Sequence, residues 1–424
     1  EIYDELKKGV DHTNEASPEQ LSSAKQLTFS ADINDIKECN IYIVTVPTPI
    51  DCHKKPDLTP LLTASQTVGT YLQKNNLVIY ESTVYPGCTE EDCVPVLEKA
   101  SGLQFNKDFY CGYSPERVNP GDKTRNVTNI RKVTSGSTPK IADQVDVLYQ
   151  SILSVPTHKA SSIKIAEASK IIENTQRDLN ISLINELALI FEKMNIDTLE
   201  VLEAAETKWN FLPFRPGLVG GHCIGVDPYY LTYKSEQLGY APDVILSGRK
   251  VNDTMGTHIA QRILSLLKKN QQSIEQSKAL VLGITFKENC PDIRNSRVVD
   301  VVRELQKEGV QVDVYDPQAQ PDEVQKTFGI SLIESIQHTY QAIVLAVGHD
   351  EFKTLDIFSF RNDSKSVIFD VKGFLLTATF IFGYLEGLID LNSWLNNSNS
   401  IFVFDFFAGN FLWIFLIETN WRPL

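Results

Sequence analysis

The segment from Ile163 to Met194 constrains the fold of this chain more than any other, because it contains neither glycine nor proline. Its apolar residues recur every three or four positions, a spacing that predicts one long helix. A shorter helix is expected from Asp197 to Glu206. The loop from Phe211 to Cys223 is rich in glycine and proline, so we predict neither helix nor strand there.

Strands and helices are expected to alternate on both sides of this helix. Short apolar runs rich in β-branched residues are separated by helical patterns such as the one from Leu61 to Lys74. Such alternation predicts parallel sheets covered by helices. We therefore predict an α/β fold with two Rossmann-like parallel-sheet domains joined by a long central helix. The expected strands are 41–46, 77–82 and 108–113 in the first domain, and 279–283, 312–316, 342–347 and 367–370 in the second.

The same patterns set the domain limits of this chain of 424 residues. A chain of this length is expected to contain two or three domains. The predicted parts are a first α/β domain at 1–160, a central helical domain with the cysteine loop at 161–258, a second α/β domain at 259–373, and a hydrophobic tail at 374–424.

The start of the first domain lacks the glycine fingerprint GxGxxG. In nicotinamide-binding domains this fingerprint joins the first strand to the first helix. Residues 1–25 instead look like the segment that follows the second strand of such a sheet. We therefore expect a first domain that is truncated at its N-terminus and exposes apolar sheet edges.

The tail contains two apolar runs, 374–389 and 401–417. A membrane span needs about 20 apolar residues with few charges. Both runs are shorter than that, and they contain Glu386 and Asp405. We favour a tail that does not span a membrane, with membrane attachment through this tail as the alternative.

Charge and cysteine content narrow the class of protein. A net charge of −14 argues against non-specific binding to nucleic acid. The seven cysteines show no CxxC spacing and no cluster with histidine, so we expect free thiols and no metal site. This pattern and the absence of a signal peptide at the start of the sequence favour a cytoplasmic protein.

Cys223 is the leading candidate for a catalytic group. It follows Gly220 and Gly221, and glycines allow the backbone to approach a ligand closely. A thiol in such a loop can attack a substrate carbon, and Asp227 could hold a water molecule or a lysine ammonium. The alternative is a small buried cysteine in a tight turn.

The long helix carries a second group of candidates. Lys170 and Asn174 are four residues apart and share one helix face, with Glu167 beside them. The alternative is a solvated face of salt bridges, and this is the interpretation we adopt for Glu167.

Two further candidates stand at the carboxyl ends of predicted strands, where sheets of this kind bind ligands. Thr83 and Glu116 offer a hydroxyl and a carboxylate that could position water, although a turn residue and a helix-start acid are the plainer interpretations. The motif Pro47-Thr48-Pro49 falls at the same edge.

The second α/β domain begins with a strand followed by the turn from Gly283 to Ser296. Lys287 and Arg294 lie in this strand-to-helix turn, a place where phosphates bind. The alternative is an exposed basic pair on a loop. Arg249 forms another polar cluster with Asn252 and Asp253, for which a solvated face is the alternative.

In this order the motifs resemble the UDP-glucose/GDP-mannose dehydrogenase family over about residues 1–373. The segments 211–228 and 283–296 carry the resemblance to the family. The segments 114–123 and 211–217 are similar to the branch that acts on UDP-N-acetylhexosamines, such as the glucosamine and galactosamine forms.

The resemblance implies a four-electron, NAD-dependent oxidation of a sugar C6 alcohol to a uronic acid for polysaccharide biosynthesis. Cys223 matches the nucleophile that forms a thiohemiacetal and then a thioester. Lys170 and Asn174 match donors to the oxyanion, and Asp227 matches the acid near the cysteine. Thr83 and Glu116 match the pair that positions the hydrolytic water.

The remaining assignments also follow the resemblance. The predicted cofactor-binding residues are Pro47, Thr48, Thr83 and Arg294. The predicted substrate-binding residues are Arg117, Lys170, Asn174, Arg215, Gly220, Arg249, Phe286 and Lys287. The resemblance also implies a homodimer built on the central helix.

The chain departs from the family at two places. Pro120 stands where part of the family has a second acid, which weakens an assignment to UDP-glucose. The missing glycine fingerprint predicts weak NAD binding by the chain as written. UDP-glucose dehydrogenase, GDP-mannose dehydrogenase and a truncated, non-catalytic chain are therefore kept as alternatives.

Overall fold

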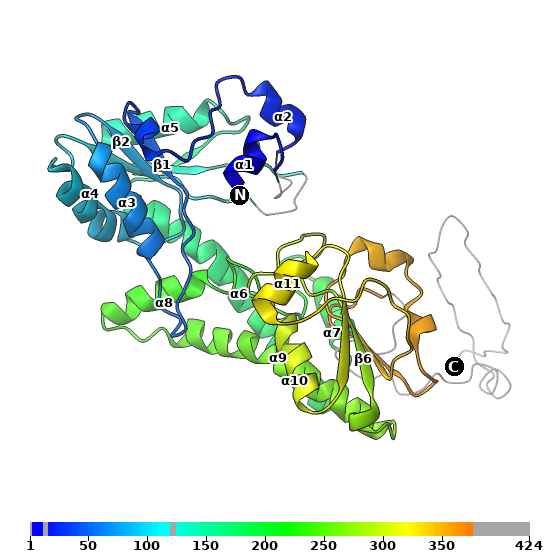
Figure 1. The fold of residues 1–424 in the computed structure, drawn as a ribbon. Coiled ribbons are helices and arrows are strands. Elements are labelled where there is room, and N and C mark those ends of the chain that lie inside the picture. Colours follow the sequence, from blue (N-terminus) through cyan, green and yellow to red (C-terminus); the bar gives the residue numbers. More distant parts are fainter. Residues whose placement is uncertain (1, 12–15, 119–123, 376–424) are drawn as a thin grey trace, which may run out of the picture.

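The computed structural model describes residues 2–11, 16–118 and 124–375. Two sheets lie in separate parts of the molecule, and the helices α6 (Ile163–Met194), α8 (Asp227–Gln237) and α9 (Asp243–Lys269) connect them (Figure 1). The predicted α/β architecture, with two sheets and a long central helix, is confirmed for the described residues. The predicted tail lies outside them from residue 376 onward.

Short helical elements complete the described chain. The α-helices are α1 (Ile2–Lys7), α2 (Pro18–Ser23), α3 (Thr59–Tyr71), α4 (Val94–Ser101), α5 (Pro139–Gln150), α7 (Thr198–Glu206), α10 (Val298–Lys307) and α11 (Pro321–Phe328). The shorter turns of helix are η1 (Ile33–Ile36), η2 (Thr89–Cys93), η3 (Ile274–Gln276), η4 (Asp350–Thr354) and η5 (Ile357–Phe360).

The first sheet has the strand order β1-β2-β3-β4-β5. Its strands are β1 (Ile41–Val44), β2 (Leu77–Tyr80), β3 (Tyr110–Tyr113), β4 (Val133–Gly136) and β5 (His158–Lys159). The first three are parallel, but β4 runs antiparallel to β3, so this edge departs from the expected parallel arrangement. The described residues between β3 and β4 contain no helix, so the chain turns back instead of crossing over the sheet.

Strand β2 is the centre of the first core, because it is buried on both faces. Val78 and Tyr80 pack in the cluster that contains Leu61 and Leu97 of α3 and α4, whereas Ile79 faces α5. Burial on both faces is typical of strands in parallel sheets covered by helices. The edge strand β1 exposes Ile41 and Ile43, at 42% and 47%, in agreement with the expected apolar edge.

Helix α6 has the limits that the sequence predicts. The Ser162 hydroxyl caps its first turn by accepting from the Ile165 N–H, and Asn195 ends it in the left-handed conformation. The helix packs along α9 and α8 and also contacts the first sheet at β3 and β4. It therefore brings residues of the first sheet and of the helical part to one place.

The second sheet is parallel throughout, with the order β7-β6-β8-β9. Its strands are β6 (Lys278–Leu282), β7 (Gln311–Tyr315), β8 (Ala342–Leu345) and β9 (Val367–Asp370). One face packs against α9 and α10, and the other packs against the segment of η4 and η5. None of the helices in the described part of the chain is long and apolar enough to cross a membrane.

Candidate active site

The loop that carries Cys223 is pressed against the turn that follows β6. Gly221 has a φ of +81°, and a Cβ there would lie 2.6 Å from the Phe286 ring. A Cβ on Gly220 would lie 2.8 Å from the Asn295 carbonyl oxygen. The Gly221 N–H also donates to the carbonyl of Arg294 at 3.1 Å. Only glycine allows this close approach, which leaves Cys223 exposed at the bend of the loop.

Three buried polar side chains lie close to Cys223. Asn174 Nδ2 donates to Asp227 Oδ2 at 2.5 Å, which joins helices α6 and α8. The Asp227 N–H donates to the Cys223 carbonyl at 2.8 Å, so the acid is fixed to the cysteine loop. Lys170 is buried one turn before Asn174 and interacts electrostatically with Asp227 and the thiol. The structure therefore brings these four predicted residues together.

The environment of the site shifts two ionisation equilibria. Burial raises the pKa of Asp227 to about 6, against the lowering effects of Lys170 and Asn174. Burial also raises the pKa of Cys223, and the Asp227 charge adds to this effect while Lys170 opposes it. Although Cys223 is open to solvent as a residue, the protein around its sulfur is dense enough to disfavour the thiolate. A nearby lysine ammonium is thus the main group that favours ionisation of the thiol.

Glu167 is fully buried, so the solvated face that we adopted for it is wrong. Its carboxylate accepts from the N–H groups of Gly87 at 2.5 Å and Thr89 at 2.9 Å. Burial raises its pKa to about 7, although these hydrogen bonds lower it. Glu167 therefore ties the turn after β2 to α6, three residues before Lys170. No local pattern in the sequence indicates this contact, because its partners are about 80 residues away.

Thr83 and Glu116 follow β2 and β3 at the carboxyl edge of the first sheet, where the sequence placed them. Glu116 is exposed and accepts from the Arg117 N–H at 2.6 Å. Lys132 is buried behind it, 3.0 Å from Glu81 and 4.0 Å from Glu116. Pro120, the second departure from the family pattern, lies outside the described residues.

The same edge of the sheet fits the nicotinamide end of a dinucleotide. Thr48 is buried in the loop after β1, and Tyr230 fixes this loop by donating to the Pro49 carbonyl at 3.0 Å. Pro47 is exposed beside it, and Thr83 is half-buried after β2. Small polar groups at the carboxyl ends of parallel strands are typical of such a binding place.

Two buried side chains that the sequence analysis did not predict fix the turn after β6 through hydrogen bonds to its backbone. Asp316 Oδ2 accepts from the N–H groups of Ile284 at 2.6 Å and Thr285 at 3.1 Å. His349 Nδ1 accepts from the Asn289 N–H at 3.0 Å, which leaves Nε2 facing Asp316 at 3.2 Å. Burial alone would raise the pKa of Asp316, but His349 and the backbone donors lower it.

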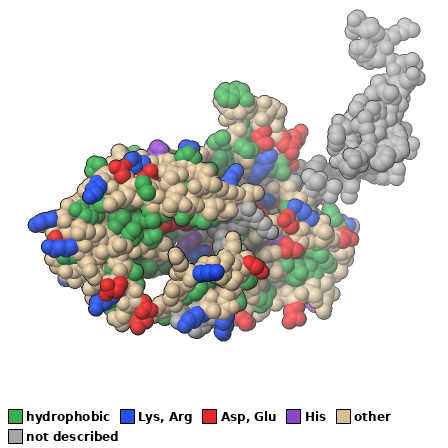
Figure 2. Space-filling model, turned by 90° about the horizontal axis from the view of Figure 1, so that it is seen from above, with side chains coloured by type: hydrophobic (Ala, Val, Ile, Leu, Met, Phe, Trp, Pro, Cys, Tyr) green, Lys and Arg blue, Asp and Glu red, His purple; other side chains and the backbone are tan. Residues whose placement is uncertain are grey.

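A small pocket lies between this turn and the cysteine loop. Its lining residues are Leu218, Gly220, Thr285, Phe286, Ser296, Arg297, Val298, Ala346, Val347 and Lys372. Two of the predicted substrate-binding residues, Gly220 and Phe286, are therefore part of it. Lys372 was not predicted, although its place just after β9 at the carboxyl edge could have indicated it. Figure 2 shows that the surface of the molecule is deeply hollowed near its middle.

The two basic residues of this turn are half-buried or exposed. Arg294 is exposed and forms an ion pair with Asp292. It also interacts electrostatically with Cys223. The pKa of His222 is lowered chiefly by burial, and the positive charge of Arg294 lowers it further. Lys287 is half-buried in the same turn. The structure thus places both predicted residues in the turn that follows β6, and their binding of anionic groups stays a prediction.

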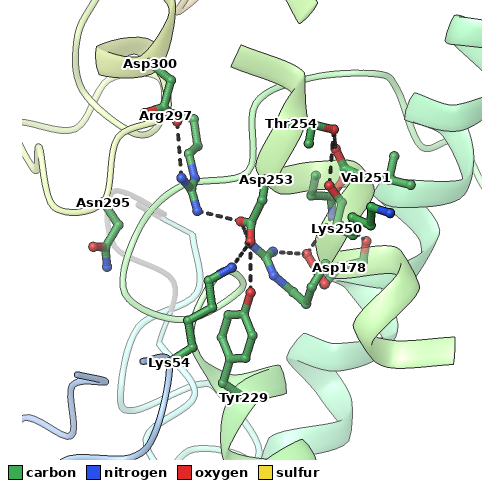
Figure 3. Close-up of polar contacts among 12 residues, drawn as sticks. Lys54, Asp178, Tyr229, Lys250, Val251, Asp253, Thr254, Asn295, Arg297 and Asp300 are labelled. Atoms are coloured by element: carbon green, nitrogen blue, oxygen red, sulfur yellow. Dashed lines mark hydrogen bonds and ion pairs between the residues drawn. The ribbon is translucent and has the colours of Figure 1, made fainter. Parts of the chain in front are cut away.

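The other predicted arginines are each paired with acidic side chains. Arg117 binds Glu173 of α6 at 2.8 Å, and Arg215 binds Glu206 of α7 through two contacts. Arg249 is buried between Asp178 and Asp253, so its solvated alternative is wrong. Figure 3 shows the side chains of Asp178 and Asp253 in this cluster.

Three sequence models of the UDP-glucose/GDP-mannose dehydrogenase family match the chain. The NAD binding domain matches residues 3–153, the central domain matches 164–254, and the UDP binding domain matches 280–377.

Curated relatives and solved structures agree with these matches. The UDP-N-acetyl-D-glucosamine 6-dehydrogenase of Salmonella typhi is 57% identical over 372 residues, 87% of each chain. The enzyme of the same name from Pseudomonas aeruginosa is 56% identical over 87% of this chain and 88% of its own. The structure of a UDP-D-ManNAc dehydrogenase from Pyrococcus horikoshii has a TM-score of 0.79 at 29% identity and 88% coverage of both chains.

Proposed function

Because the chain belongs to the UDP-glucose/GDP-mannose dehydrogenase family, we propose that it oxidises the C6 alcohol of a UDP-N-acetylhexosamine to the carboxylate, with NAD as cofactor. The observation that carries the proposal is the exposed Cys223 beside buried Lys170, Asn174 and Asp227. A thiol, a cation and an amide donor are the groups that covalent oxidation of an aldehyde requires. The product, a UDP-linked uronic acid, is a building block for surface polysaccharide.

The thiol accounts for two oxidations at one site. Loss of two electrons and two protons from the alcohol gives an aldehyde, and addition of the Cys223 S–H across its carbonyl gives a thiohemiacetal. Loss of two more electrons and two protons gives a thioester. Water then cleaves the C–S bond, releases the acid and restores the thiol. The covalent link keeps the aldehyde bound between the two oxidations.

Lys170 and Asn174 are proposed to stabilise the oxygen of the reacting carbon. Both are buried, so their charge and dipole act in a medium of low polarity, where electrostatic stabilisation is strong. Asp227 holds the Asn174 amide at 2.5 Å and therefore fixes its direction. The same carboxylate interacts electrostatically with Lys170.

Thr83 and Glu116 are proposed to position the water that hydrolyses the thioester. Their elements β2 and β3 are neighbours in the sheet, so both side chains emerge at one edge. The half-exposed Glu116 carboxylate can accept a proton from water. The ammonium of Lys132 lies 4.0 Å from this carboxylate.

NAD supplies the hydride acceptor when it is bound. Pro47, Thr48 and Thr83 at the carboxyl edge of the first sheet would hold its nicotinamide end, and Arg294 would pair with its phosphates. The UDP group is assigned to the region of the pocket lined by Phe286 and Lys372, with Lys287 next to Phe286 in the same turn. Arg117, Arg215 and Arg249 remain proposed substrate residues, each held in place by an acidic partner.

The proposed substrate branch follows two relatives of 57% and 56% identity, which are named UDP-N-acetyl-D-glucosamine 6-dehydrogenases. UDP-glucose and GDP-mannose remain alternative substrates. The domain limits 1–160, 161–258 and 259–373 are part of the same proposal. We also propose a cytoplasmic location, because the seven cysteines, all in the described residues, are free.

A homodimer through α6 is proposed on the basis of an apolar stripe. Five residues of this helix expose between 44% and 57% of their surface, namely Ile165, Ile172, Leu183, Ile190 and Met194. Their spacing places all five on one line of a helix with 3.6 residues per turn. An exposed apolar stripe of this kind is typical of a helix that packs against a second copy.

The function is tested by the stoichiometry of NADH formation with UDP-N-acetylglucosamine. Two NADH per sugar and a carboxylate product are expected. UDP-glucose and GDP-mannose, assayed in parallel, should give a kcat/KM lower by at least tenfold. One NADH per sugar with release of aldehyde would contradict the proposal.

A further inference from the structure

One carboxylate joins three parts of the chain that are far apart in sequence. Asp253 of α9 accepts from Lys54 Nζ at 2.5 Å and from Arg297 Nη2 at 2.5 Å. It also accepts from Tyr229 Oη at 2.9 Å and from Arg249 Nη2 at 2.5 Å. Figure 3 shows Lys54, Tyr229 and Arg297 converging on Asp253.

The donors come from different parts of the fold. Lys54 belongs to the loop between β1 and α3 of the first α/β part. Arg297 immediately precedes α10 of the second α/β part, while Tyr229 and Arg249 belong to the helical part. Within the described part of the chain, the Asp253 carboxylate thus binds one cation from each of the two α/β parts.

The cluster is balanced in charge and partly withdrawn from water. Arg249 is buried and pairs with Asp178 of α6 at 2.6 Å, and Arg297 also contacts Asp300 at 3.2 Å. Burial alone would raise the pKa of Asp253, but Arg249, Lys54 and Arg297 lower it. The carboxylate is therefore ionised at neutral pH and binds all its partners at once. Charge-assisted hydrogen bonds of this kind hold both distance and direction.

The cluster also lies directly behind the candidate active site. Tyr229 is two residues after Asp227 on α8, and the centre of its ring lies 5.0 Å from Lys54 Nζ and 5.6 Å from Arg249 Cζ. A Cβ on Gly225, in the cysteine loop, would lie 3.9 Å from Arg249 Nη2. A shift of Asp253 would thus reach the cysteine loop through one intervening side chain.

We propose that Asp253 is a positioning residue that sets how the two α/β parts are placed around the cysteine loop, by binding Lys54 from one part and Arg297 from the other. The two parts carry the proposed NAD and UDP-sugar sites, and the hydride must pass between them. An interaction that fixes their separation therefore acts on the reaction without touching a substrate.

The test compares Asp253→Asn with Asp300→Asn in the full chain. Asp300 of α10 contacts the same Arg297, but the two residues are three positions apart in one part of the fold, so their ion pair joins no two parts. Small-angle scattering should show a larger radius of gyration for Asp253→Asn alone, with an unchanged helix content by circular dichroism. Its kcat/KM should fall on the order of 100-fold, the effect expected of a misplacement of about 1 Å. Asp300→Asn should stay within about threefold of the wild type.

An Asp253→Asn protein with wild-type scattering would overturn the proposal, even if its activity fell, because the residue would then act only locally. Equal effects of the two variants would overturn it as well. If Asp253→Asn does not fold, Lys54→Met decides, since the Lys54 side chain is 50% exposed and its loss should not unfold the chain. Lys54→Met should expand the molecule while the neighbouring Lys55→Met does not. The kinetic comparison rests on the proposed dehydrogenase function, whereas the scattering comparison stands without it.

Discussion

Asn174 donates its side-chain N–H to Asp227 at 2.5 Å, and this contact joins the two helices that meet beside Cys223. Without this contact, burial of the Asp227 carboxylate would cost more free energy, because the group is enclosed by protein and burial raises its pKa to about 6. A group that is retained at such a cost is a candidate for function rather than for stability. This relationship leads to the first prediction.

Asp227→Asn should be more stable than the wild type at neutral pH, although it should be far less active. The folded-state pKa of about 6 lies above the usual 3.8, so the contribution of Asp227 to stability is full below pH 4 and is lost as the pH rises through 6. The variant should therefore gain about 1–3 kcal/mol in the free energy of unfolding at pH 7. Urea unfolding at pH 7 and pH 4 measures this. A loss of stability at pH 7 would contradict it.

Glu167 should control the pH dependence of turnover through the turn that carries Thr83. When ionised, the carboxylate accepts from Gly87 and Thr89, and burial raises its pKa to about 7. Protonation removes one of these acceptors, so kcat should fall as the pH drops through 7. Glu167→Gln should remove this acid limb and lower kcat by roughly 10- to 100-fold with little change in KM.

The control for this prediction is Glu186→Gln, which alters an exposed glutamate of the same helix. Its pH profile should match that of the wild type. An unchanged acid limb in Glu167→Gln would show that another group is responsible.

Gly221 and Gly225 should respond differently to alanine. At Gly221 the φ of +81° and a ring carbon of Phe286 at 2.6 Å make a Cβ doubly unfavourable. At Gly225 the nearest atom to a Cβ would be 3.7 Å away, an ordinary contact. Gly221→Ala should cost about 2 kcal/mol or more in stability and most of the activity. Thermal unfolding and kcat/KM of both variants measure this. Equal losses in the two variants would mean that the close approach of Gly221 to Phe286 does not determine the structure of the loop.

Leu183→Lys should convert the proposed dimer into a monomer. The side chain lies in the middle of the apolar stripe on α6, and burying a lysine ammonium between two helices is unfavourable. Sedimentation velocity at micromolar concentration should show a dimer for the wild type and a monomer for the variant. Retention of the dimer would place the interface on another surface.

The sequence predicted those features that depend on neighbouring residues. The limits of α6 follow from periodicity and local caps. The approach of Lys170 and Asn174 to Asp227 spans about 50 residues, and it was expected only because the motifs resemble the family. The carboxyl-edge positions of Thr83 and Glu116 follow from strand order.

Contacts over long sequence separations were not predictable from these patterns. Glu167 appears on the sequence as one more charge on a helix, and only the fold brings Gly87 to it. The same is true of Asp253 and Lys54, which are 199 residues apart. The antiparallel β4 also depends on how the chain turns after β3, and no local signal marks it.

The most direct test of the central claim is the intact mass of the protein during turnover with NAD and UDP-N-acetylglucosamine. In Glu116→Gln, hydrolysis should be slowed and a covalent adduct with the mass of the thioester should accumulate, located on Cys223 by peptide mapping. The double variant Glu116→Gln, Cys223→Ala should show no adduct and no carboxylate product, and it should form at most one NADH per sugar, because only the second oxidation needs the thiol. An adduct on another residue, or carboxylate formation that persists in Cys223→Ala, would contradict the assignment of Cys223 as the nucleophile.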